Sequence, residues 1–208
     1  MGKPVVYGAD YSVYVRIVRL ALEEKGIDYE LVPVDVFAAE GIPAWYLEHH
    51  PFGRIPAFEH DGFRLFETNA ITRYADEAFD GPALQPKEPR SRSRMNQIIG
   101  LLDAYAYRSM VWDVAVEQLE KAAPDETLIA NGLSQARKAL QALSSLKAPG
   151  PWLLGDQLTL ADLHAAPIIG YFLKVADGRE LLAEFSEIQD WWHRIAARAS
   201  FERTEQIG

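Results

Sequence analysis

A serine at the start of an apolar helical pattern is the first residue whose type and position could do chemistry. Ser12 directly precedes the periodic run that begins at Val13, and Arg16 follows one turn later. A serine hydroxyl at a helix N-terminus can cap the helix by accepting a hydrogen bond from the backbone. It can also donate a hydrogen bond to an anion, in a place where the helix dipole adds positive potential. Capping alone explains a single serine of this kind, so other motifs must decide its role.

Two further stretches place polar groups at predicted turns and helix starts. Residues 50–56, His-Pro-Phe-Gly-Arg-Ile-Pro, end in an Ile-Pro pair that could be a plain hairpin lead-in, although the preceding Pro-Phe-Gly weakens that explanation. Glu67-Thr68 begins a second helical pattern. A helix N-terminus with a hydroxyl suits a carboxylate, and Glu67 suits an ammonium group. An ordinary capped helix explains this pair about as well.

The cysteine count limits the chemistry that these residues can perform. The 208 residues include no cysteine, which excludes a disulfide framework, a thiolate zinc site and a cysteine nucleophile. Any sulfur chemistry must therefore come from a ligand. The five histidines show no metal-ligand spacing, so we expect no metal.

Charge and hydropathy exclude other classes of protein. The formal net charge of −9 argues against nucleic-acid binding, because a phosphate backbone needs a clustered basic surface. The basic run at 90–94 opens a helix that soon turns acidic and aromatic, which favours a solvated or subunit-facing surface. No stretch approaches the roughly 18 apolar residues of a membrane span, and the first residues lack a signal-peptide pattern. We expect a cytoplasmic protein that binds neither nucleic acid nor membrane.

The elements that must position these residues follow from the periodicity of the first 80 residues. The alternation of β-rich and helical patterns predicts βαβ followed by ββα. Asp61-Gly62 is a strong hairpin signal between the last two strands. The predicted elements are strands at 4–8, 29–34, 55–60 and 64–67, and helices at 13–26, 44–49 and 67–79.

The remainder of the chain is helical in period. Three prolines and a glycine in residues 80–89 indicate a linker, so we expect domains at 1–80 and 90–208 joined by residues 81–89. Thr159 and Asp162 have the spacing of a capping box at the start of one of the later helices. The predicted helices cover residues 90–122, 125–146, 159–176 and 187–199.

Four patterns in one order resemble the glutathione S-transferase family. They are Ser12 opening the first helix, the run at 50–56, Glu67-Thr68, and the Gly-Asp-Gln-Leu-Thr-Leu-Ala-Asp run at 155–162. The resemblance covers nearly the whole chain. Within the family, the chain is similar to the serine-dependent theta and phi classes, and it looks like a bacterial member. It implies an α/β plus all-α fold, with a thioredoxin-like glutathione-binding domain followed by a bundle of helices.

This resemblance also implies an activity. Ser12 would donate a hydrogen bond to the sulfur of glutathione, and a donor to the thiolate lowers the pKa of a thiol from its ordinary value of about 8.5. The thiolate would then attack a small hydrophobic electrophile, in a detoxification reaction that needs no cofactor beyond glutathione as co-substrate. Organic hydroperoxides are a second class of substrate. A homodimer is expected, and a non-catalytic interaction or ligand-binding module is the alternative.

The resemblance assigns most of the glutathione contacts. The bond before Pro56 would be cis, the backbone of Ile55 would pair with the peptide, and Glu67 with Thr68 would hold its γ-glutamyl end. The stretch from Phe37 to Trp45 lacks the basic residue expected for the glycine carboxylate. The residues that could replace it are His49, His50 and Arg54.

Several tyrosines leave alternatives open. Tyr7 is a rival donor to the sulfur because it ends the first strand, where other classes of the resembled family keep a catalytic tyrosine. Tyr11 and Tyr14 are further rivals, because both lie close to Ser12 in the sequence, and we favour Ser12 over all three. The hydrophobic substrate is expected to contact one face of the long second-domain helix. The candidates for this pocket are Tyr11, Tyr107, Met110 and Tyr171.

Overall fold

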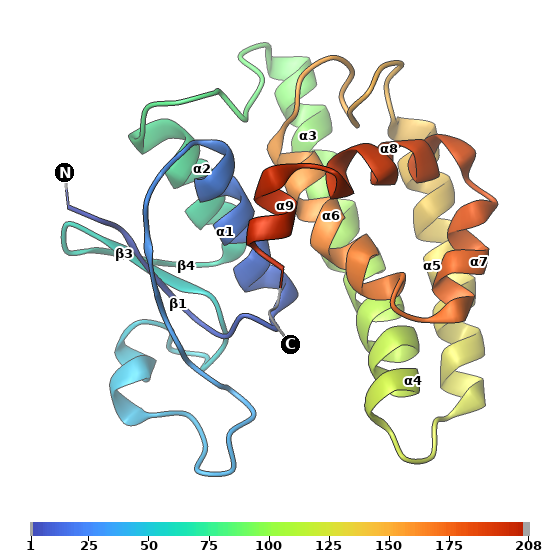
Figure 1. Ribbon diagram of the computed structural model, residues 1–208, viewed down its shortest axis with the longest axis horizontal. Coiled ribbons are helices and arrows are strands. Elements are labelled where there is room, and N and C mark those ends of the chain that lie inside the picture. The colour runs from blue at the N-terminus through green and yellow to red at the C-terminus, as the bar shows by residue number, and fades with distance from the viewer. Residues whose placement is uncertain (1, 206–208) are drawn as a thin grey trace. The chain divides into compact units, whose positions relative to one another are not determined.

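The computed structural model describes residues 2–205 of the chain. Contacts between residues divide it into two compact units (Figure 1). The first unit runs to Leu84 and also includes the segment that begins at Ala199, whereas the second unit spans Gln85 to Arg198. The division near the proline-containing stretch resembles the expected one, but the described residues 199–205 group with the first unit. Within the described residues, no helix is both long and apolar enough to cross a membrane.

The first unit is built on a four-stranded sheet in the order β2-β1-β3-β4. Strand β1 (Val5–Tyr7) pairs in parallel with β2 (Glu30–Val32) and antiparallel with β3 (Ala57–His60), which pairs antiparallel with β4 (Phe63–Phe66). The turn at Asp61-Gly62 has positive φ at both residues, 48° and 80°, as a tight hairpin turn requires. The predicted βαβ and ββα order is confirmed.

Two helices cover one face of this sheet. Helix α1 (Val13–Glu24) ends at a C-cap Lys25, followed by Gly26 with φ 70° and an Ile27 N–H that bonds the Leu22 carbonyl at 2.9 Å. Gly26 thus ends the helix in the left-handed conformation that glycine adopts without strain, close to the end predicted for the helix at 13–26. Helix α2 (Thr68–Ala78) packs beside α1. The buried cluster between these helices and the sheet consists of Val6, Val15, Val18, Leu22, Phe58, Ile71 and Ala75.

The opposite face carries a smaller apolar cluster around the short 3₁₀ helix η1 (Ala44–Glu48). Tyr46 is fully buried there against Val34 and Ala57, with Tyr7 and Ile42 at the edge. Tyr7 therefore points to the face away from α1. Because side chains alternate along a strand, the preceding Val6 faces the helices.

The second unit is entirely helical in its regular elements as described. One continuous run replaces the predicted helix at 90–122, and it contains two stretches with π-type turns. Ser109 lies within the second stretch and donates from its hydroxyl to the carbonyls of Tyr105 and Ala106, at 2.8 and 3.2 Å. The elements are α3 (Pro89–Leu101), η2 (Leu102–Ala106), η3 (Arg108–Val116), α4 (Glu117–Glu120), α5 (Glu126–Leu146), α6 (Leu160–Phe172), α7 (Ala176–Ala183) and α8 (Ser186–Ala196).

The predicted capping box is confirmed at the start of α6. The carboxylate of Asp162 accepts hydrogen bonds from the backbone N–H and the hydroxyl of Thr159, at 2.8 and 3.0 Å. It also accepts from the Leu153 N–H and from Trp191 Nε1, both at 2.8 Å. Asp162 is completely buried, and burial raises the pKa of its carboxyl group. One side chain thus joins the start of α6 to a preceding loop and to α8.

Candidate active site

Ser12 is the N-cap of α1 and is half-buried. Its Oγ lies 3.4 Å from the Val15 N–H, from which it accepts a hydrogen bond, and its own N–H donates to the Ala9 carbonyl at 3.2 Å. A serine hydroxyl has one hydrogen to donate in addition to its accepting lone pairs. The capping role therefore leaves that hydrogen available, so capping and donation to an anion are compatible.

Gly8 brings a second segment close to the start of α1. Its φ is 155°, and a Cβ added there would lie 2.4 Å from Val15 Cγ2 and 3.2 Å from the Cβ of Ile55. Only a residue without a side chain allows so close an approach. The loop that carries Ile55 consequently packs next to the first turn of the helix that Ser12 caps.

The backbone of Ile55 is the part of this loop that could pair with a ligand. The Ile55–Pro56 peptide bond is cis, as the resemblance predicts. No backbone hydrogen bond of Ile55 occurs among the described residues, and β3 begins only at Ala57. The Tyr46 hydroxyl donates to the Arg54 carbonyl at 2.6 Å and so fixes the preceding residue. An extended peptide could pair with the free N–H and C=O of Ile55 as an added strand does.

The start of α2 presents a second set of donors. Glu67 is its exposed N-cap and has φ 72° and ψ 110°, an unusual conformation for a residue with a side chain. The first helical hydrogen bonds run from the N–H groups of Ala70 and Ile71 to the Glu67 carbonyl, at 2.9 and 3.0 Å. The N–H groups of Thr68 and Asn69 precede these bonds and face out of the helix end. Strained backbone held in place by its surroundings is common at binding sites.

The three basic candidates for the glycine carboxylate lie in different environments. His50 is 3% exposed, its ring packs 4.9 Å from the Phe66 ring, and burial lowers its pKa. His49 lies beside Tyr7 and has its Nε2 3.4 Å from the Glu59 carboxylate. Arg54 is exposed, and in the described part of the chain its guanidinium has no hydrogen bond or ion pair. Of the three, Arg54 has the charge and the exposure that a carboxylate ligand needs.

The rival tyrosines differ in what their side chains contact. The Tyr11 hydroxyl donates to Asp35 Oδ1 at 2.7 Å, and burial together with this bond raises the pKa of Tyr11. Tyr7 packs among Trp45, Tyr46 and His49 on the face of the sheet away from α1. Tyr14 is half-buried in the first turn of α1. The Tyr11 hydroxyl is therefore used within the protein, and the Tyr7 ring lies on the face of the sheet away from the helix that Ser12 caps.

Three candidates for the hydrophobic substrate lie in the second unit. Met110 is 1% exposed and belongs to the core of η3. Tyr171 on α6 donates to Glu120 Oε1 at 3.1 Å, and Lys174 Nζ lies 4.6 Å from the centre of its ring. Burial first, then Glu120 and Tyr107, raise the pKa of Tyr171 to about 12. The Tyr171 hydroxyl is thus held by Glu120, whereas Met110 is available only as packing.

Two contributions to the site were missed from the sequence. Asp35 accepts a hydrogen bond from the Tyr11 hydroxyl, and the only indication of this role in the sequence was the position of an aspartate shortly after the predicted second strand. Gly8 separates Val15 from Ile55, and its only signal was a glycine at the end of the first strand. Among the described residues, no group of three or more histidine, aspartate or glutamate side chains is arranged to hold a metal ion.

Comparison with known proteins adds independent information. Residues 6–83 match the family described as glutathione S-transferase, N-terminal domain, and residues 101–199 match glutathione S-transferase, C-terminal domain. Glutathione S-transferase F13 of Arabidopsis thaliana is 30% identical over 202 residues, which cover 94% of this chain and 92% of the relative. Glutathione S-transferase PARB of Nicotiana tabacum is 30% identical over 94% of each chain.

A solved structure gives the same result for the fold. Glutathione transferase F7 from Populus trichocarpa has a TM-score of 0.84 to this chain, at 30% identity and with 97% of each chain covered. All three of these proteins come from plants, so the bacterial look expected from the sequence has no support among them.

The family matches cover most of both units, and the relatives align over nearly the full length of the chain. The predicted fold, a thioredoxin-like domain followed by a helical domain, is confirmed by these matches. The chain therefore belongs to the glutathione S-transferase family and is a glutathione-dependent transferase.

Proposed function

We propose that this transferase is of the serine type and that Ser12 stabilises the thiolate of bound glutathione. The observation that carries the proposal is the capping geometry of Ser12, whose Oγ accepts from the Val15 N–H and keeps its hydrogen for a ligand. A hydrogen bond to the charged form and the positive end of α1 both lower the pKa of a thiol. Only the thiolate is a good nucleophile.

The first unit offers complementary groups for the rest of the peptide. The free backbone of Ile55, beside cis Pro56, would pair with the cysteinyl residue. Glu67 would face the ammonium group of the γ-glutamyl end, and the N–H groups and hydroxyl at the start of α2 would hold its carboxylate. Arg54 would bind the glycine carboxylate, because burial of His50 leaves that ring unsuited to the task.

The reaction follows from the thiolate. Its sulfur would attack the electrophilic carbon of a small hydrophobic substrate, forming a carbon–sulfur bond while the leaving group departs with its electron pair. Attack on the oxygen of an organic hydroperoxide would begin in the same way. Tyr11, Tyr107 and Tyr171 remain candidates for contacts with the hydrophobic substrate, whereas Met110 is buried in the core of the second unit. We further propose a homodimer located in the cytoplasm, with no cofactor beyond glutathione.

The decisive experiment is a titration of the bound thiol. The thiolate absorbance of the glutathione complex is followed against pH for the wild type, Ser12→Ala and Tyr14→Phe. We expect Ser12→Ala to raise the apparent thiol pKa and to lower kcat about 10²-fold, as the loss of one donor to an anion does. An unchanged thiol pKa in Ser12→Ala, together with a raised one in Tyr14→Phe, would assign the donor to Tyr14 instead.

A further inference from the structure

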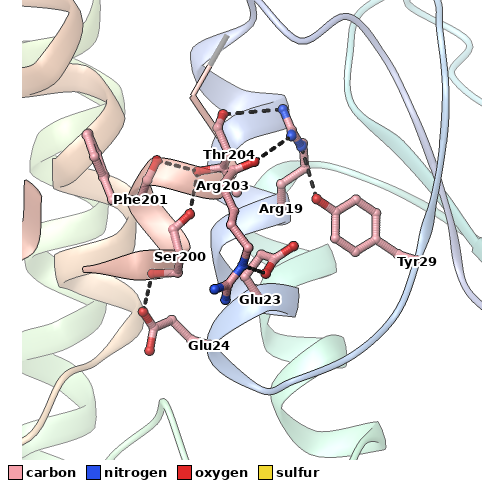
Figure 2. A network of polar contacts seen from close by, with 8 residues as sticks. All are labelled: Arg19, Glu23, Glu24, Tyr29, Ser200, Phe201, Arg203 and Thr204. Atoms are coloured by element: carbon pink, nitrogen blue, oxygen red, sulfur yellow. Dashed lines mark hydrogen bonds and ion pairs between the residues drawn. The ribbon is translucent and has the colours of Figure 1, made fainter. Parts of the chain in front are cut away.

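The last described segment of the chain lies along α1, the helix that Ser12 caps (Figure 2). Helix α9 (Ala199–Arg203) and the following Thr204 contact side chains on one face of α1. Residues three, four and seven positions apart share a helix face. The α1 residues in these contacts are Arg16, Arg19, Glu23 and Glu24.

Arg16 makes the contacts nearest to Ser12. Its guanidinium carbon lies 3.9 Å from the centre of the Phe201 ring, and its Nη2 donates to the Phe201 carbonyl at 2.9 Å. Its Nε lies 3.4 Å from the hydroxyl of Thr204. Phe201 is 6% exposed and Thr204 is fully buried, so these contacts are shielded from water. A guanidinium that stacks on a ring and also donates two hydrogen bonds has little freedom to move.

Arg19 extends the same interface by one turn. It donates to the carbonyls of Thr204 and Arg203 at 3.3 and 3.5 Å, and to the Tyr29 hydroxyl at 3.0 Å. Carbonyls at the C-terminal end of a helix lack partners within the helix and carry the negative end of its dipole. Two arginines of α1 therefore cap the end of α9, which explains how so short a helix is held.

The opposite end of the interface lies farther from the candidate active site. Arg203 pairs with Glu23 at 2.7 Å in an exposed position, and the Ser200 hydroxyl bonds the Glu24 carboxylate. Glu23 lies eleven residues after Ser12, which is about 16 Å along the helix axis. The two ends of the interface can therefore be weakened separately.

We propose that residues 199–204 form a C-terminal latch that holds the first turn of α1 and thereby positions the Ser12 hydroxyl. Arg16 is the positioning residue, because its N–H bonds the Ser12 carbonyl at 2.9 Å while its side chain is fixed by Phe201 and Thr204. The inference rests on the proposed role of Ser12 as thiolate donor. Holding a donor in place matters because a displacement of about 1 Å can cost up to 10²-fold in rate.

The test compares one variant at each end of the interface. Phe201→Leu, at the end near Ser12, removes the aromatic ring that stacks on Arg16. Arg203→Gln, at the end far from Ser12, removes the ion pair with Glu23. Three quantities are measured: the apparent pKa of bound glutathione, kcat and KM for glutathione, and amide hydrogen exchange in the first turn of α1. Arg16→Lys provides a second variant of the near end if Phe201→Leu does not fold.

We expect the near-end variants to raise the thiol pKa, to lower kcat about tenfold with KM changed less than about twofold, and to speed exchange at the Arg16 N–H. Arg203→Gln should change none of these. The latch would be overturned if the near-end variants kept the wild-type hydrogen exchange and the wild-type thiol pKa. It would also be overturned if Arg203→Gln changed these quantities as much as the near-end variants do. Ser12→Ala is measured in parallel: if it leaves the thiol pKa unchanged, the donor assignment has failed, whereas the exchange result still decides the latch.

Discussion

The Tyr11 hydroxyl donates a 2.7 Å hydrogen bond to Asp35 Oδ1 and so joins the loop before α1 to the loop after β2. Asp35 also accepts from the Phe37 N–H at 2.9 Å. The Tyr11 hydrogen is thus used within the protein, although Tyr11 is the immediate neighbour of Ser12. The contact therefore distinguishes the Tyr11 hydroxyl from the Ser12 hydroxyl, which the sequence alone left as competing donors to the glutathione sulfur.

The Tyr11–Asp35 bond predicts an acid-sensitive contribution to stability. The bonds from Tyr11 and from the Phe37 N–H lower the pKa of Asp35 in the folded state. Since the folded pKa is depressed, this contribution is present above the ordinary pKa of about 4 and is lost as the pH falls through the lowered value. Tyr11→Phe should reduce the free energy of unfolding at pH 7 more than at about pH 2, as measured by urea unfolding. The double variant Tyr11→Phe/Asp35→Asn is the control, and an equal loss at both pH values would contradict the assignment.

Arg54 should distinguish glutathione from a derivative that is esterified at the glycine carboxylate. Arg54→Gln is expected to weaken binding of glutathione about tenfold, which corresponds to the loss of one charge-assisted hydrogen bond. Binding of the ester should already be weak in the wild type and should change little in the variant. Calorimetric titration measures both ligands, with His49→Gln as the control. If His49→Gln shows the ester-dependent loss and Arg54→Gln does not, the carboxylate contact belongs to His49.

The start of α2 should affect binding rather than turnover. Glu67→Gln and Thr68→Ala would remove the proposed contacts to the γ-glutamyl end of glutathione, which is remote from the reacting sulfur. A contact that is equally strong in the ground state and the transition state changes KM but not kcat. We expect KM for glutathione to rise about tenfold while kcat at saturating glutathione stays within about twofold. A fall in kcat with unchanged KM would place these residues near the sulfur.

The elements that position the site could be predicted because their signals are local. Ser12 before an apolar run, Lys25-Gly26 at its end and Asp61-Gly62 between two strands each act within a few residues. The π-type turns at Ser109 could not be foreseen, since a helical period does not specify which carbonyl each N–H reaches.

The latch and the choice among basic residues depend on contacts between distant segments. Helix α9 has five residues, too few to be stable alone, and its partners Arg16 and Arg19 lie more than 180 positions earlier. Likewise, His50 is buried because the chain folds it against Phe66 in β4, while Arg54 stays exposed. The sequence named His50 and Arg54 as candidates for the carboxylate contact but could not rank them, and it gave no sign of the contacts between α1 and α9.

A buried ion pair fixes the end of α1 and gives the last prediction. Lys25 Nζ lies 3.1 Å from Asp76 Oδ1, with side-chain exposures of 2% and 6%, and it also donates to the carbonyls of Asp76 and Pro82 at 2.9 and 3.2 Å. Asp76 Oδ1 in turn accepts from the Leu84 N–H at 2.8 Å. The pair therefore joins the ends of α1 and α2 to the segment that leads out of the first unit.

Lys25→Met should lower the free energy of unfolding by about 3–5 kcal/mol, because it leaves the Asp76 carboxylate buried without its countercharge. The double variant Lys25→Met/Asp76→Leu should recover part of this loss, since it removes the unpaired charge as well. Chemical unfolding of the wild type, both single variants and the double variant gives the coupling free energy. Replacing the exposed Lys3, which pairs with Asp28 at 3.0 Å, is the matched control and should cost less than about 1 kcal/mol. If Lys25→Met costs no more than that control, the pair does not hold α1 to α2, and the end of the helix must be fixed by the Gly26 turn and apolar packing alone.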